Sequence, residues 1–103
     1  LVYMTAPDEE EARSIARMLV EKRLASGVNI LPGARSMYWW DGKVQDESET
    51  LLFAQTTYDR FPAFETAVKQ MHSYEVPCIV GLPMGTGNFD YLDWVAREAA
   101  PIE

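Results

Sequence analysis

The sequence predicts an α+β protein of the ferredoxin-like class, in which a βαββαβ chain is followed by a C-terminal helix. Three observations predict this class. Apolar extended runs alternate with segments of helical period, in the order β-α-β-β-α-β-α. Asp41-Gly42 is a two-residue hairpin signal between the second and third extended runs. The chain has 103 residues, of which 48% are hydrophobic, so residues 1–103 are expected to form a single domain.

The first strand is expected at residues 1–4, and the first helix follows it. Asp8 and Glu11 have the spacing of a helix start, and the acidic residues there suit the positive end of the helix dipole. Gly27 is the predicted end of this helix. The apolar residues at helical spacing are Ala12, Ile15, Ala16, Leu19, Val20 and Leu24.

Extended structure resumes at residues 28–40, where Pro32-Gly33 is expected to bend or bulge the strand. After the turn, the return arm over residues 43–57 begins polar and becomes apolar. Its charged part, residues 45–49, is expected to be solvated and to project beyond the sheet.

Asp59 is the predicted cap of the second helix, with Pro62 in its first turn. A long last strand is expected around residues 79–82, and Asn88 is expected to cap the third helix. The buried stripes predicted for these two helices are Phe64, Ala67, Val68 and Met71, then Leu92, Val95 and Ala99.

The extended runs are apolar on both faces. Neighbouring side chains of a strand point to opposite sides of the sheet, yet residues 1–4, 37–40, 51–54 and 79–82 show no alternation. Both main helices are expected on one face, so another copy of the chain or a partner must cover the second. We therefore expect Trp39 or Leu52 to lie in a contact between subunits, together with any functional site.

Charge and cysteine content limit the classes of partner. The net charge is −7, from 16 acidic and 9 basic residues, which argues against nucleic acids and anionic membranes. No stretch approaches the ~18 apolar residues of a membrane helix. The single cysteine, Cys78, excludes an intrachain disulfide and makes the cytoplasm the default compartment. Because Leu1 already lies in an apolar run, we expect the natural chain to begin before it.

Three groups of residues could carry chemistry, and each also has a purely structural interpretation. Tyr38, Trp39 and Trp40 could form an aromatic ligand wall, although interface packing is favoured. His72, Tyr74 and Glu75 lie between a helix and a strand, where a histidine beside a carboxylate is a general base, a metal ligand or a helix-end cap. Cys78 is read as a small core residue, and the loop at residues 85–88 as a turn into a helix cap.

Several motifs, taken in order, resemble the CutA family of divalent-cation tolerance proteins over nearly the whole chain. The matching motifs are Thr5-Ala6-Pro7-Asp8, Val28-Asn29-Ile30-Leu31-Pro32-Gly33, Tyr38 with Trp40, Gly42-Lys43-Val44, His72-Ser73-Tyr74-Glu75-Val76-Pro77, and Gly87-Asn88 with Tyr91 and Trp94. The resemblance implies a ferredoxin-like subunit, a tight homotrimer and a likeness to the PII signalling proteins. It also implies a role in tolerance of copper and other divalent cations, with no established reaction.

Two positions depart from the family pattern. Gly27 stands where many members have a cysteine, which removes the soft ligand that copper(I) prefers. Ser73 stands where proline is usual, and we expect it to loosen the connection between helix and strand.

From these observations we predict a binding site in a cleft between subunits. It is built around His72 as the metal ligand, with Tyr74 and Glu75 beside it. The further predicted ligand-binding residues are Trp40, Lys43 and Glu47. The expected ligand is a divalent cation, copper or a small molecule, and no catalytic residue is predicted.

Three other functions were weighed. An acylphosphatase-type enzyme would need an arginine-bearing anion loop after the first strand, but residues 5–10 are acidic there. An RNA-recognition module would show basic and aromatic residues on its third strand, and residues 51–56 show neither pattern. A structural trimer that anchors or signals to other proteins stays open as the alternative.

Overall fold

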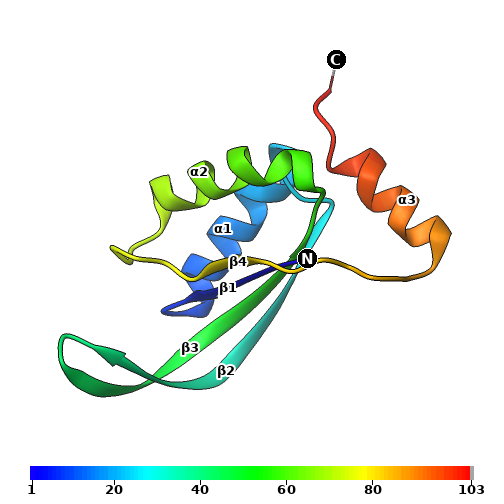
Figure 1. Ribbon diagram of the computed structural model, residues 1–103. Coiled ribbons are helices and arrows are strands. Elements are labelled where there is room, and N and C mark those ends of the chain that lie inside the picture. Colours follow the sequence, from blue (N-terminus) through cyan, green and yellow to red (C-terminus); the bar gives the residue numbers. More distant parts are fainter. Residues whose placement is uncertain (103) are drawn as a thin grey trace.

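The computed structural model describes residues 1–102, and its four strands form one antiparallel sheet in the order β2-β3-β1-β4 (Figure 1). The predicted ferredoxin-like class is therefore confirmed. The elements are β1 (Val2–Ala6), α1 (Glu9–Glu21), β2 (Gly27–Trp40), β3 (Lys43–Gln55), the 3-10 helix η1 (Tyr58–Arg60), α2 (Phe61–Met71), β4 (Ile79–Gly81) and α3 (Phe89–Glu98).

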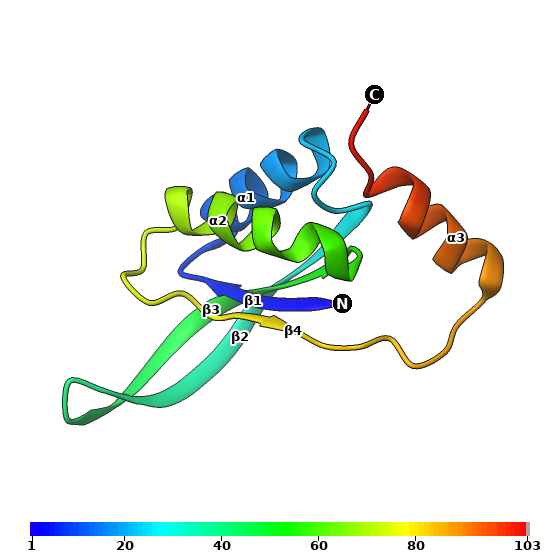
Figure 2. The ribbon, with the colours of Figure 1, turned by 45° about the horizontal axis from the view of Figure 1, so that its top comes forward.

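Helices α1 and α2 cover the same face of the sheet, as Figure 2 shows from above. Side chains of β1 and β3 meet those of the two helices in a single core. Its largest fully buried members are Val2, Met4, Ile15, Leu19, Leu52, Phe64 and Val68. Because Leu52 is 0% exposed within this core, the prediction that it lies in a contact between subunits was wrong.

The opposite face of the sheet carries apolar side chains that no helix covers. Tyr3 pairs with Phe53 on one side and with Val80 on the other, and the rings of Tyr3 and Phe53 lie 5.6 Å apart. Leu31 extends the same face at β2 and is 48% exposed. We call this surface the free face of the sheet.

Helix α1 begins as predicted but ends earlier. Asp8 accepts a hydrogen bond from the Glu11 N–H at 2.8 Å. The helix stops at a left-handed Arg23 (φ 55°), where the Leu24 N–H donates to the Leu19 carbonyl at 2.9 Å. This is a Schellman ending, so the prediction that Gly27 terminates the helix was wrong. Gly27 is instead the first residue of β2.

The later elements differ from prediction in two places. Asp59 lies inside η1 and accepts from the Thr57 hydroxyl, so it does not cap α2, which begins after Arg60. Strand β4 has three residues rather than a long run. Asn88 caps α3 as predicted, accepting from the Asp90 N–H at 2.9 Å.

The hairpin of β2 and β3 reaches well past the rest of the sheet (Figure 1). The last pair that joins β3 to β1 is Ala6–Thr50, while β2 and β3 stay paired from Ala34–Glu49 to Trp40–Lys43. Asp41 and Gly42 both have positive φ, 54° and 72°, which identifies the predicted two-residue turn as type I′. The polar arm therefore projects as expected, but the expectation that all of residues 45–49 are solvated was wrong at Glu49, which is only 6% exposed.

Helix α3 stands apart from the other two helices and is joined to β4 by an extended segment (Figure 2). An ion pair of 2.9 Å links Glu98 of α3 to Arg23. Trp94 lies over the start of β2. Within residues 1–102, no helix combines the length and the hydropathy that crossing a membrane requires.

Candidate functional site

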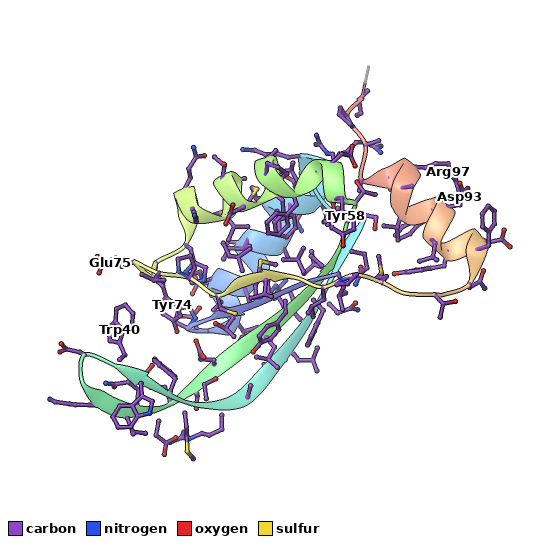
Figure 3. The ribbon with its side chains drawn as sticks, in the orientation of Figure 1. Trp40, Tyr58, Tyr74, Glu75, Asp93 and Arg97 are labelled. Carbon is purple, nitrogen blue, oxygen red and sulfur yellow. The ribbon has the colours of Figure 1, made fainter. Side chains whose placement is uncertain are left out.

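A groove of roughly 800 Å³ lies between the β2–β3 hairpin and the 72–78 connection, which joins α2 to β4. Its floor is the part of the free face formed by Tyr3 and Thr5 of β1. Figure 3 shows Trp40 on the hairpin and Tyr74 on the connection facing one another across it. Of the six predicted site residues, the groove brings together Trp40, Glu47, Tyr74 and Glu75.

A β-bulge decides which hairpin side chains face the groove. The pairing of β2 with β3 is regular up to Leu31–Leu51 and resumes at Ala34–Glu49, so β2 holds one extra residue there. Gly33 has φ 82°, a conformation that glycine adopts without steric cost. Because the extra residue reverses the alternation, Tyr38 and Trp40 share the free face with Leu31. The predicted bend at Pro32-Gly33 is confirmed.

Two tyrosine hydroxyls hold two carboxylates on β3. Tyr74 donates to Oε2 of Glu49 at 2.8 Å, and Tyr38 donates to Oε2 of Glu47 at 2.9 Å. Glu47 and Glu49 are two residues apart, so both project on the same side of the strand. Glu49 is only 6% exposed, so its hydrogen bond from Tyr74 replaces lost solvation.

The pKa values of two tyrosines and of the cysteine in the groove are raised, so these groups stay protonated. Burial, and then the hydrogen bond to Glu49, raise the pKa of Tyr74 far above its usual value. The bond to Glu47 is the main cause of the raised pKa of Tyr38. Burial, followed by the nearby Glu49 carboxylate, raises the pKa of Cys78. At neutral pH the two phenols and the thiol therefore remain neutral hydrogen-bond donors around the groove.

His72 lies behind the groove and lines none of it. Its side chain is fully buried, and its Nε2 lies 2.8 Å from the Thr5 carbonyl oxygen. Its Nδ1 accepts from the Tyr74 N–H at 3.0 Å, so Nε2 carries the hydrogen and donates. With both nitrogens engaged, this ring orients the connection. The prediction of His72 as a metal ligand would require one of these bonds to break.

Ser73 fastens the connection to α1. Its N–H and its hydroxyl both donate to Oε2 of Glu11, at 3.2 and 3.0 Å. A proline at this position would have no N–H to offer, so the serine makes a backbone hydrogen bond that a proline could not. These two bonds count against the expectation that Ser73 loosens the connection.

The remaining predicted residues lie elsewhere. Lys43 pairs with Trp40 at the hairpin turn but does not line the groove. Gly27 is at the opposite end of β2, so a cysteine there would be remote from the groove. A Cβ at Gly27 would also meet Oε1 of Gln55 at 3.0 Å. Among residues 1–102, no group of three or more histidine, cysteine or acidic side chains is arranged to hold a metal ion.

Sequence reasoning missed several lining residues, notably Tyr3, Thr5, Glu49 and Cys78. The two-residue spacing of Glu47 and Glu49 was a usable signal, because it places both on one face of a strand. Tyr3 and Cys78 could not be found this way, since their meeting with β3 depends on strand order and register.

The chain matches proteins of one family along its length. The profile described as "CutA1 divalent ion tolerance protein" matches residues 1–98. A divalent-cation tolerance protein CutA from Thermus thermophilus is 50% identical over 95 residues, 92% of this chain and 92% of that protein. Protein CutA from Homo sapiens is 44% identical over 95 residues, 92% of this chain but 53% of the human protein. The chain thus spans about half of the human relative.

Solved structures show the same fold. The "Cut A1" divalent cation tolerance protein of Thermus thermophilus superposes with a TM-score of 0.92 at 49% identity, covering 94% of each chain. The "periplasmic divalent cation tolerance protein CutA" of Archaeoglobus fulgidus superposes with a TM-score of 0.92 at 40% identity, covering 96% of each chain.

Proposed function

This chain belongs to the CutA1 divalent ion tolerance family, and from that premise we propose that it is a PII-like homotrimer that binds a cation or small ligand at clefts between its subunits, as part of a response to metal ions. The observation that carries the proposal is the groove, which Glu47, Glu49 and Glu75 line, with Glu47 and Glu49 on one side of β3. Carboxylates are ligands for hard divalent cations, and a concave site with a few polar groups is the usual form of a binding site.

Uncovered apolar surface supports the homotrimer. Trp39 is 74% exposed on the projecting hairpin, and Met37 and Val44 beside it are also exposed. Leu31 and Val80 add to this surface on the free face. A repeated head-to-tail contact that closes into a ring would bury all of it, and would place the mouth of the groove against a neighbouring subunit.

The residues present do not fit a preformed copper(I) site. Such a site needs thiolate or an unoccupied imidazole, whereas both nitrogens of His72 are engaged and burial raises the pKa of Cys78. Oxygen donors of Glu47 and Glu49 suit a harder divalent ion held loosely. We therefore propose cation binding through carboxylates, with copper(I) as a poor ligand.

We propose further that the protein catalyses no reaction, and that it works in the cytoplasm with a protein partner still to be identified. The names of its relatives refer to cation tolerance rather than to a reaction. The single cysteine is compatible with a reducing compartment.

Calorimetric titration of the full-length protein with zinc chloride tests the proposed function. We expect saturable binding that Glu47→Gln and Glu49→Gln each weaken on the order of tenfold, because each removes a negative oxygen ligand. Glu65→Gln is the matched control, since Glu65 lies on α2 beside Lys69, and it should leave binding unchanged.

Equal zinc affinity in all three variants would place the cation elsewhere and contradict the groove as its site. An assembled protein that binds neither zinc nor small ligands would favour the alternative function, a trimeric anchor or signalling module.

A further inference from the structure

We infer that the groove is a receptor for an organic ammonium cation, such as the alkylated ammonium head of a larger, partly apolar molecule. This inference rests on the proposed function, since it names the class of ligand that the same groove takes. Three features carry it: an aromatic lining, a buried carboxylate with an unused oxygen, and a charge balance that excludes anions.

The aromatic lining comes from three separate segments. Tyr3 contributes from β1, Tyr38 and Trp40 from β2, and Tyr74 from the 72–78 connection. Trp40 and Tyr74 face one another from opposite sides, as Figure 3 shows. Aromatic faces attract cations through their quadrupoles, and cages of this type are the common way in which proteins hold quaternary ammonium groups.

Glu49 supplies the charge at the inner end. Its Oε2 accepts from Tyr74, and no donor within residues 1–102 bonds its Oε1. Every fully buried side-chain oxygen or nitrogen in that part of the chain has a partner, so Oε1, which has none, keeps some exposed surface, and Glu49 lines the groove. A carboxylate that is 6% exposed and has an open oxygen is an acceptor for a ligand cation.

The charge balance favours cations over anions. Glu47, Glu49 and Glu75 line the groove, and Arg35 is the one cationic residue among the described residues that line it. The Arg35 guanidinium donates to Asp46 at 2.7 Å and to Ser48 at 3.3 Å, which lie on the side of β3 opposite to Glu47 and Glu49, so its charge is turned away from the two glutamates.

An organic cation makes smaller geometric demands than a metal ion. A divalent metal ion needs several oxygens within about 2.6 Å of one point. A diffuse, weakly hydrated ammonium group needs one carboxylate oxygen and gains from the rings, so the open oxygen of Glu49 suffices for it. A volume of roughly 800 Å³ is larger than such a head alone requires, so the natural ligand carries an apolar body as well.

Titration of the full-length, assembled protein with choline and with its neutral isostere 3,3-dimethylbutan-1-ol tests the inference. The two probes have nearly the same shape and differ in charge. We expect choline to bind at least tenfold more tightly, and Glu49→Gln and Trp40→Leu each to weaken choline on the order of tenfold, since both the charge and the ring faces contribute.

Two variants serve as matched controls. Trp39→Leu alters the neighbouring tryptophan on the opposite side of the same strand, and Glu65→Gln neutralises an exposed carboxylate of α2. Both should bind choline like the parent. Light scattering and circular dichroism first establish that each variant keeps the parent's assembly and fold.

Each outcome decides the question. Equal binding of the two probes, no binding of choline, or full choline affinity in Glu49→Gln would overturn the inference. Zinc binding without choline binding would leave the proposed function standing and remove this ligand class. Choline binding without zinc binding would support the ammonium site and count against the divalent cation.

Discussion

Cys78 shows how one neighbouring residue sets the chemistry of another. The thiol is half-buried in the groove, and its pKa is raised above the usual 9.0 by burial first and by the Glu49 carboxylate second. Since only the thiolate is a nucleophile, the folded protein should keep this cysteine unreactive at neutral pH. A lone, buried thiol of this kind acts as a small packing residue rather than as a soft metal ligand.

The reactivity of Cys78 gives a prediction with a definite sign. The rate of its reaction with a disulfide reagent should still be rising above pH 9, because a raised pKa postpones thiolate formation. Glu49→Gln should shift the pH dependence of this rate to lower pH, because it removes the smaller cause of the raised pKa. The pKa of Cys78 should stay above that of an exposed thiol, because burial, the larger cause, remains. Glu65→Gln should leave it unmoved. A parent rate that levels off below pH 9 would contradict the assignment.

Sequence reasoning found residues whose role is local and missed those whose role depends on packing. Asp8 and Asn88 were predicted as caps because a cap needs only its next few neighbours. Arg23 was missed as the helix end because an arginine rarely adopts φ 55°. Its place is fixed by distant groups, since Arg60 donates to its carbonyl oxygen and Glu98 pairs with its guanidinium.

At the scale of elements, the hairpin is the part that the sequence predicted best. Its turn residues, the bend in β2 and the polar projecting arm all follow from local signals. Strand β4 was predicted too long, because β1, its only neighbour in the sheet among the described strands, pairs with it over Ile79–Gly81 and then offers only Leu1 to Leu82. The groove itself was out of reach, since it forms only where the hairpin passes the 72–78 connection.

The turn offers a test of how strongly the hairpin is specified. Gly42→Ala should lower the free energy of unfolding by about 1–2 kcal/mol, because Gly42 has φ 72° and an L side chain is strained there. A Cβ at this position would meet nothing within 4 Å, so the cost comes from the backbone alone.

Urea unfolding at a fixed protein concentration measures this cost. Asp41→Asn is the control, because asparagine also tolerates positive φ, and it should be close to neutral. An unchanged midpoint in Gly42→Ala would mean that the turn relaxes to another type without loss.

At the scale of the whole molecule, the exposed apolar surface predicts that the protein assembles with further copies of itself. Helices α1 and α2 cover one face of the sheet, and the free face with the hairpin carries exposed apolar side chains, which the proposed homotrimer would cover. The reading of apolar runs from the sequence anticipated this surface. The error over Leu52 arose because such runs do not reveal which alternate residues face the helices.

Leu31→Glu tests the predicted homotrimer. Light scattering of the parent at low micromolar concentration should give the mass of three chains, and the variant should fall to smaller species, because the new carboxylate would be buried unpaired. Val20→Glu is the matched control, as Val20 is 43% exposed on α1 and Leu31 is 48% exposed on the free face. A stable monomeric parent, or a Leu31→Glu variant that assembles like the parent, would argue against this contact.

The single extra residue in β2 decides which of the alternating hairpin side chains face the groove. If β2 kept all its residues but paired continuously, Gly33 would stand opposite Glu49, and Trp39 and Met37 would replace Trp40 and Tyr38 on the side of the groove. The aromatic side chains proposed to bind the ammonium group and the exposed apolar side chains of Met37 and Trp39 would trade sides of the hairpin, although none of these residues had been substituted. Among related chains, a change of strand register at this point can therefore alter which side chains line the groove, and positions that align by sequence need not face the same way.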